Sequence, residues 1–441
     1  MIFAALMLVV FSAVFRWAVP AMDLISGGFD WLAEIVNQRM ADGALKSLIV
    51  DGVIAGVGGV LVFLPQIFIL FFFIAVLEDC GYMARAAYLM DKLMVRVGLS
   101  GKSFIPLLSS FACAIPGVMA TRVIENRRDR LTTMMVAPLM TCSARLPVYA
   151  LLIAAFIPED FLFGGLLGLQ GLTLFAMYLL GIVTAVVVAL LLKKTILRGA
   201  TPAFVMELPG YKLPSLKLVI HRMFDRGWAF VRRAGTLIFA VAVVVWAAAY
   251  YPRDPQTIDA TLIRQLAEVD QQLAATRNVK NEQAIADLEQ QKTDLENRID
   301  GQFLRQSYLG RTGRTIEPLV RPLGWDWRIG CAAIASFPAR EVVVGTLGVI
   351  YNIGGDADEE SADLRDQLQA AKWEGTDRPV YTIPVALSLM VFFALCAQCA
   401  ATLAIIRRET ASWRWPIFTF VYMTTLAYVG ALLTYQVGSL L

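Results

Sequence analysis

Long apolar stretches alternate with short polar loops along almost the whole chain. About twenty consecutive apolar residues are enough to carry a helix across a bilayer. Seven stretches meet this requirement, and we predict full spans at 1–19, 53–77, 131–157, 163–192, 233–251, 381–406 and 415–436. The pattern therefore predicts an all-α, polytopic membrane protein.

Two further apolar stretches, 104–121 and 329–351, are interrupted by proline, glycine or charged residues. Proline removes a backbone donor, and irregular backbone is tolerated in a membrane only where it lines protein or water. We interpret both stretches as re-entrant hairpins. If 329–351 crosses completely, the number of spans rises from seven to eight.

The two broken stretches share short strings, which suggests an internal repeat. Ser110 in the first matches Ser336 in the second, and phenylalanine follows each of them. The long helices predicted after the broken stretches contain Cys142 and Cys399. The loop charges place the start of the first repeat outside the membrane and the start of the second repeat inside. We therefore predict an inverted repeat, the arrangement that builds transporter sites near the bilayer midplane.

Basic loops predict the orientation. Segments 125–130, 193–233 and 407–408 are rich in Arg and Lys and should be cytoplasmic. Segments 158–162 and 352–378 are acidic or neutral and should lie outside. Under this topology the chain starts inside.

One polar segment, 257–303, interrupts the membrane pattern. Its apolar residues keep a 3–4 spacing in two runs, which predicts an antiparallel coiled-coil hairpin outside the membrane: Leu262, Leu266, Val269, Leu273; Ile285, Leu288, Leu295, Ile299. We expect it to be a structural decoration, with partner binding as the alternative.

The predicted organisation has three parts. A first membrane part, 1–251, contains the first broken region at 52–157. An extracytoplasmic segment, 252–328, and a second membrane part, 329–441, follow it.

Composition agrees with a membrane location. The chain is 58% hydrophobic and 17% charged, whereas soluble domains carry about 25% charged residues. Six cysteines lie in or beside apolar segments, which disfavours a disulfide framework. The single histidine, His221, excludes a site that needs two imidazoles, including the usual zinc and non-haem iron sets.

Charged residues at the predicted membrane segments require a partner or a function, because burying them is costly. Glu78 and Asp79 end the second span, Arg145 follows Cys142 by three residues, and Arg340 and Glu341 lie in the second broken stretch. Arginines and carboxylates could pair to hold helices in register. Alternatively, the three acids could line a cation path.

The first broken stretch also places a thiol beside an interrupted helix, at Cys113. Sulfur together with freed carbonyl oxygens suits a borderline cation such as Fe(II), whereas Mg and Ca prefer oxygen alone. Cys142 repeats the arrangement on what we predict to be a helix. The competing interpretation is that each is a small buried hydrophobe, as membrane cysteines usually are.

Two motifs carry little weight. Gly101-Lys102-Ser103 resembles the end of a phosphate loop, but that loop requires glycine at position 96, which is Arg96 here. The Cys396-x-x-Cys399 pair lies in an apolar span and not in a βαβ unit, which disfavours a redox role.

Several long strings resemble the FeoB ferrous-iron transporters: Asp51–Gly59, Phe63–Gln66, Leu77–Arg85, Gly101–Pro106, Ala137–Pro147, Ala339–Val344 and Arg408–Trp413. They cover most of the chain outside the hairpin. The paired broken stretches are similar to the gate regions of that family, which nucleoside transporters share. The chain departs from the family pattern at Gln398, where we expect proline, and in the hairpin, which looks like an insertion.

The resemblance implies Fe(II) import across a bacterial inner membrane, with metal ligands at Cys113, Cys142, Glu78, Asp79, Glu341 and Cys399. It implies Fe(II) as substrate and no permanently bound cofactor. Family members also carry a GTP-binding domain, which no string here supplies, so we expect the chain itself not to be an enzyme. The implied partners are Fe²⁺, the lipid bilayer, a separate G-protein domain, small accessory proteins and further copies of the chain, with no nucleic acid.

Two alternatives remain. A transporter with the same gate architecture could carry a nucleoside or another divalent metal. A membrane scaffold or receptor could use the outer hairpin to bind a partner, but this would leave the buried charges and the repeated interruptions without a role.

Overall fold

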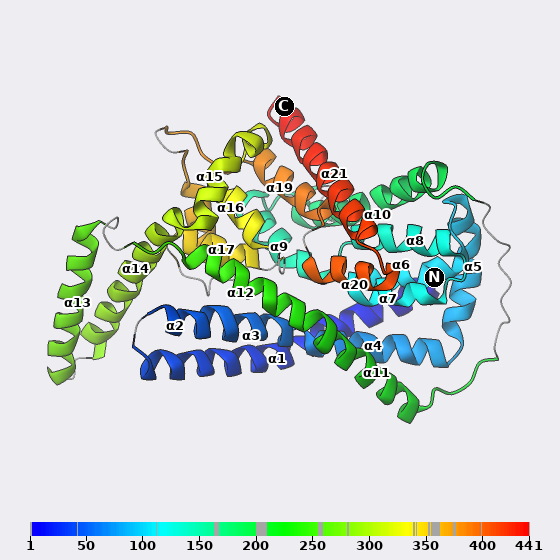
Figure 1. The fold of residues 1–441 in the computed structure, drawn as a ribbon, viewed down its shortest axis with the longest axis horizontal. Coiled ribbons are helices and arrows are strands. Elements are labelled where there is room, and N and C mark those ends of the chain that lie inside the picture. The colour runs from blue at the N-terminus through cyan, green and yellow to red at the C-terminus, as the bar shows by residue number, and fades with distance from the viewer. Residues whose placement is uncertain are drawn as a thin grey trace. The chain divides into compact units, whose positions relative to one another are not determined.

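The computed structural model describes residues 2–41, 43–111, 113–162, 167–199, 210–254, 259–279, 282–337, 340, 342–351, 353, 362–373, 376–397 and 399–440. Within these ranges the chain is almost entirely helical (Figure 1). The only paired strands described are two residues long, β1 (Phe161–Leu162) and β2 (Leu167–Gly168), which run antiparallel. The predicted all-α class is confirmed.

Five described helical stretches are long and apolar enough to cross a membrane: Ala44–Asp79, Arg127–Phe156, Leu169–Lys194, Ile383–Thr410 and Arg414–Gly438. They correspond to five of the predicted spans. The predicted span 233–251 contains a shorter apolar helix, α12 (Thr236–Tyr250). Residues 2–19 of the predicted span 1–19 lie within α1 (Ile2–Arg39). The chain is thus a polytopic membrane protein.

The chain divides into two compact units, each built from separate segments. The first comprises Met1–Ala144, Phe175–Val243 and Ala394–Ala427. Its elements are α1, α2 (Ala44–Ser47), a π-helical segment (Leu48–Ile54), α3 (Ala55–Leu61), α4 (Leu64–Asp79), α5 (Tyr82–Arg96), α6 (Phe104–Ser110), α7 (Ala114–Ala120), α8 (Arg127–Val136), most of α10 (Leu169–Lys194), α11 (Leu216–Phe230), the start of α12, α20 (Ala400–Thr410) and the first part of α21 (Arg414–Gly438). In this unit α4 packs against α1 and α11, and α7 packs against α6 and α20.

The second unit comprises Arg145–Leu174, Val244–Phe393 and Tyr428–Leu441. It contains α9 (Leu146–Phe156), α13 (Ala260–Val279), α14 (Glu282–Gln306), α15 (Tyr308–Val320), α16 (Trp327–Ala335), α17 (Val342–Ile350), α18 (Ala362–Ala370) and most of α19 (Ile383–Leu395). Here α16 packs between α15 and α17, and α9 packs against α17 and α18.

The polar segment 257–303 contains the two helices α13 and α14, which pack against each other. Val269 and Leu273 are buried, and Lys292 Nζ lies 2.8 Å from Asp270 Oδ1 across the pair. Asn297 also donates a hydrogen bond to the carbonyl of Ile353, which ties α14 to the end of α17. The position of this hairpin outside the membrane stays a prediction.

The first broken stretch is interrupted where the sequence indicates. Helix α6 ends at Ser110, and α7 begins at Ala114. Close packing of the two halves depends on Gly117, because a Cβ there would lie 1.9 Å from Ser110 Oγ and 2.8 Å from the Pro106 carbonyl oxygen. Glycine, with no Cβ, is the residue that allows this close backbone approach.

Two stretches predicted to be continuous helices are also broken, which corrects the interpretation of their cysteines. Helix α8 ends at Val136, and two short 3-10 turns, Ala137–Leu139 and Ser143–Arg145, precede α9. Pro138 and Pro147 each stand at the first turn of a new helical segment, where proline is tolerated because its missing donor would be unused. Cys142 therefore lies in the break and not on a helical face shared with Arg145.

The last long stretch is broken in the same way. Helix α19 ends at Leu395, α20 begins at Ala400, and Cys399 has an extended backbone (φ −154°, ψ 99°). Gln398 lies outside the described residues. Cys142 and Cys399 thus share with Cys113 a position at an interruption between helical segments.

Candidate functional site

Cys113 lies directly before α7, at the break in the first interrupted stretch. Its backbone is extended (φ −155°, ψ 135°), and its thiol is half-buried. The nearby hydroxyls of Ser109 and Ser110 donate to the carbonyls of Ile105 and Pro106, at 3.0 and 2.8 Å. Both of these hydroxyls are therefore used within α6.

Cys399 occupies the same local position before α20 as Cys113 does before α7. Both residues are extended and half-buried, and α7 and α20 pack against each other within the first unit. The sequence comparison instead matches Cys399 with Cys142, so this equivalence emerges only from the fold. The neighbouring helices α7 and α20, which we call the half-helices, therefore each begin directly after a cysteine.

Cys142 is half-buried in the break that follows α8. This break packs against α10 at Gly181, where an added Cβ would lie 3.0 Å from the Leu139 carbonyl oxygen and 3.1 Å from Thr141 Oγ1. Thr141 is fully buried, and its hydroxyl has no hydrogen-bond partner among the described residues. Sequence reasoning missed Thr141, although its position next to Cys142 is the signal that could have found it.

Glu78 and Asp79 at the end of α4 contact α11. Glu78 lies 3.4 Å from Arg222 Nη1 and 3.0 Å from Arg226 Nη2, and Asp79 accepts a hydrogen bond of 2.8 Å from the Ser215 backbone N–H. Glu78 therefore pairs with arginines of the basic segment and not with Arg145 or Arg340, and Asp79 accepts from a backbone N–H. Their assignment as metal ligands stays a prediction.

The second interrupted stretch is held by Arg340. This buried side chain donates from Nη1 to the carbonyl of Phe393, at 2.6 Å, two residues before α19 ends. Glu341 lies outside the described residues.

At the start of α16, Asp326 caps the helix by accepting a hydrogen bond from the Ile329 backbone N–H. Burial raises the pKa of this carboxyl to about 6.

Within the described ranges, no three His, Cys, Asp or Glu side chains gather into a cluster that could hold a metal ion. The candidate thiols instead stand at separate helix breaks.

Gly101-Lys102-Ser103 forms a 3-10 turn before α6 and not a phosphate cradle. The Gly101 backbone N–H donates to Asp91 Oδ1 at 2.8 Å, so a carboxylate already occupies the donor that a phosphate would need. Lys102 Nζ lies 2.7 Å from Glu125 Oε1, and this hydrogen bond holds the pKa of the Glu125 carboxyl below its usual value.

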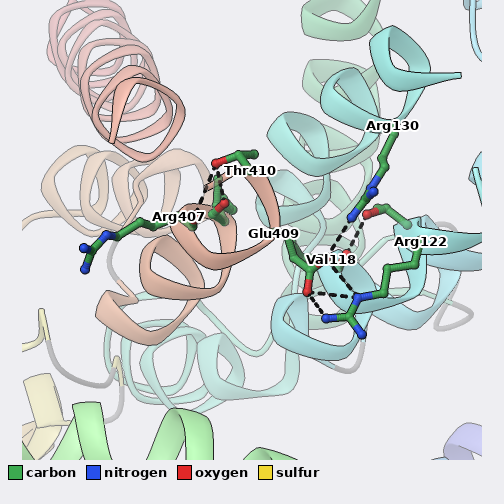
Figure 2. A network of polar contacts seen from close by, with 8 residues as sticks. Val118, Arg122, Arg130, Arg407, Glu409 and Thr410 are labelled. Carbon is green, nitrogen blue, oxygen red and sulfur yellow. Dashed lines mark hydrogen bonds and ion pairs between the residues drawn. The ribbon is translucent and has the colours of Figure 1, made fainter. Parts of the chain in front are cut away.

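A network of charges joins the far ends of the same half-helices (Figure 2). Arg122, just after α7, donates to Glu409 in the last turn of α20 through both Nε and Nη2. Arg130 of α8 donates to Oε2 of Glu409 at 2.8 Å. The Glu409 side chain is only 4% exposed. We call Arg122, Arg130 and Glu409 the Glu409 network; it ties α7, α8 and α20 together.

Interrupted membrane helices with thiols at the breaks define a gate-type integral membrane protein. The family model described as "Nucleoside recognition" (Gate) matches residues 60–156 and 231–413, which contain every break described above. The model described as "Ferrous iron transport protein B C terminus" matches residues 174–226. The chain belongs to the FeoB family of gate-containing membrane proteins.

Relatives extend along the whole chain. It is 42% identical over 441 residues to "Fe(2+) transporter FeoB" of Leptospira interrogans, covering 99% of this chain and 57% of the relative. It is 41% identical over 439 residues to the "Fe(2+) transport protein A/Fe(2+) transporter FeoB fusion protein" of Porphyromonas gingivalis, covering 100% and 50%. It is 38% identical over 446 residues to "Fe(2+) transporter FeoB" of Staphylococcus aureus, covering 100% and 57%. The chain thus spans about half the length of the curated relatives it matches. No solved structure matches it.

Proposed function

We propose that this chain forms the ion-conducting membrane part of a ferrous-iron importer in a bacterial inner membrane. The observation that carries the proposal is the position of Cys113, Cys142 and Cys399, each at a break between helical segments. Relatives that are named Fe(2+) transporters and align along the whole chain support iron as the substrate.

Thiols are the preferred ligands within the candidate set. Fe(II) is a borderline cation that accepts sulfur as well as oxygen, and the breaks supply both a thiol and backbone carbonyls. Glu78 already has arginine partners, and Asp79 accepts from a backbone N–H. As ligands they would have to leave those partners, so we propose Glu78, Asp79 and Glu341 as secondary members of the path. The hydroxyl of Thr141 adds an oxygen donor beside Cys142.

The proposed system also includes an accessory protein and control by a nucleotide. The Porphyromonas gingivalis relative carries the words "Fe(2+) transport protein A" in its name, which supports a small accessory protein as partner. The occupied donor of Gly101 supports the proposal that this chain does not itself bind or hydrolyse GTP. Control by a nucleotide would then come from a G-protein domain outside these residues.

A nucleoside is the second candidate substrate, because the matching family model carries the description "Nucleoside recognition". Recognition of a nucleoside requires amide and aromatic groups at the site, whereas the described breaks present thiols. Uptake of Fe(II), Mn(II), Zn(II) and uridine by the purified chain in liposomes separates the candidates. Uptake of uridine without Fe(II) would replace the iron proposal.

Cys113→Ser and Cys142→Ser are each expected to lower Fe(II) uptake at least about tenfold, which corresponds to about 1.4 kcal/mol of lost ligand interaction. A thiolate binds Fe(II) more strongly than a hydroxyl, but serine is close to cysteine in size and should preserve the fold. The measurement is Fe(II) uptake into liposomes, with thermal unfolding recorded for each variant.

Cys80→Ser is the matched control. Its thiol is also half-buried, but it follows α4 and donates to the Leu77 carbonyl at 3.4 Å, a bond that serine can replace. This variant should transport normally. Normal uptake by both the Cys113 and Cys142 variants would remove these two thiols from the path and leave Cys399 and the carboxylates as the candidate ligands.

A further inference from the structure

A pocket of about 430 Å³ lies in the first unit, walled by α4, α6, α7 and α11. Its walls are mainly apolar, with side chains such as Phe71, Ile74 and Ile115. Three charged residues also line it: Glu78, Arg122 and Arg226. Its volume falls within the range of about 300–1,000 Å³ that is usual for small-molecule sites. Apolar walls are poor surroundings for a bare divalent cation, so the pocket itself does not suit Fe(II), although Glu78, a secondary candidate ligand, lies in its lining.

At the pocket and beside it, arginines outnumber carboxylates. Glu78 is shared by Arg226 and Arg222, and Glu409 is shared by Arg122 and Arg130. Each carboxylate therefore compensates only one of its two arginines. An arginine fork that retains positive charge is suited to a phosphate oxygen, which it can bind in bidentate geometry.

The helix that contributes Arg226 has the features of a helix at a membrane surface. On α11, four large apolar side chains at four-residue spacing are exposed, and they share one face: Leu216, Ile220, Phe224 and Trp228. The same helix also carries Lys217, Arg222 and Arg226, and the loop charges predict a cytoplasmic position for α11. An amphipathic helix with basic residues and an exposed Trp and Phe binds the interface of anionic membranes.

We propose that this pocket is a binding site for an anionic phospholipid of the surrounding membrane. One acyl chain fills the apolar space beside Phe71 and Ile74, and the phosphate is held by Arg226 and Arg122. The exposed stripe of α11 continues the apolar surface into the bilayer. Both halves of the first interrupted stretch, α6 and α7, line the pocket, so the lipid joins α11 to the break at Cys113. The proposal does not depend on iron as the transported ion.

The test compares lipid retention by the purified full chain and its variants. Native mass spectrometry after incubation with equal phosphatidylglycerol and phosphatidylcholine should show selective retention of phosphatidylglycerol. Arg226→Gln should weaken this retention about fivefold, the effect of removing about 1 kcal/mol of attraction for one basic residue. Ile74→Trp, which changes no charge and fills the pocket, should abolish it. Phosphatidylglycerol should also raise the melting temperature of the unmodified chain and not that of Ile74→Trp.

Arg222→Gln is the matched control, because Arg222 lies on the same helix and also contacts Glu78 but does not line the pocket. Because Arg226 still lines the pocket, this variant should lose less phosphatidylglycerol retention than Arg226→Gln. Equal losses in Arg222→Gln and Arg226→Gln would show general surface attraction and overturn the pocket assignment. Unchanged retention in Ile74→Trp, or equal retention of both lipids by the unmodified chain, would overturn it as well. Fe(II) uptake is not used as a readout, so failure of the iron proposal leaves this test interpretable.

Discussion

Lys193→Met is expected to lower the free energy of unfolding by about 3–5 kcal/mol, the usual consequence of removing one member of a buried ion pair. Lys193, in the last turn of α10, donates to Asp129 in the first turn of α8. The Asp129 side chain is fully buried, and that of Lys193 is 7% exposed. Without the ammonium group, the Asp129 carboxylate would stay buried with no opposite charge. Chemical unfolding in detergent, followed by tryptophan fluorescence, measures the loss.

Lys194→Met provides the control, since Lys194 is the exposed neighbour on the same turn and should change stability little. The double variant Asp129→Asn, Lys193→Met removes both charges and should recover most of the loss. A loss of less than about 1 kcal/mol in Lys193→Met, the range of surface pairs, would contradict the buried pair.

Glu409→Ala is expected to destabilise the protein by about 2–3 kcal/mol, because hydrogen bonds to charged groups each contribute about 1.5–3 kcal/mol and the arginines are partly exposed to water. Glu409 accepts from Arg122 and Arg130, so its removal should also loosen the ends of α7 and α20. Hydrogen exchange should increase in residues 116–123 and 403–410, while exchange in α15 and α16 of the second unit stays unchanged.

The matched control is Glu125→Ala, which removes the same side chain from an exposed pair. Glu125 contacts Lys102 and is 87% exposed, so its loss should change stability little. Equal destabilisation by the two variants, or faster exchange spread evenly over the chain in Glu409→Ala, would show that the Glu409 network does not specifically hold α7 to α20.

The membrane class and the first helix break could be predicted from local sequence. The length of an apolar run determines whether a helix can cross a bilayer, and proline and glycine change backbone geometry at their own positions. For this reason the apolar stretches correspond to membrane-length helices, and the interruption near Cys113 lies where Pro116 and Gly117 indicate. The FeoB resemblance likewise follows from local sequence, because contiguous strings of residues carry it.

The tertiary structure decided which helices are continuous and which charges meet. Apolar composition does not distinguish a broken helix from an intact one, so the break at Cys399 is not evident from the sequence, and the break at Cys142 is marked only by Pro138 and Pro147. Of the charges expected to pair within the membrane segments, Glu78 instead contacts Arg222 and Arg226 of α11. Glu409, which the sequence did not single out, contacts Arg122, 287 residues away. Hydrophobic periodicity gives information only about residues that are a turn or two apart along the chain. A buried charge is tolerated only when the fold brings a partner of opposite charge close to it. The sequence by itself therefore determined the membrane character and the family, and only the packing of α4, α7, α11 and α20 determined the charged contacts around the candidate site.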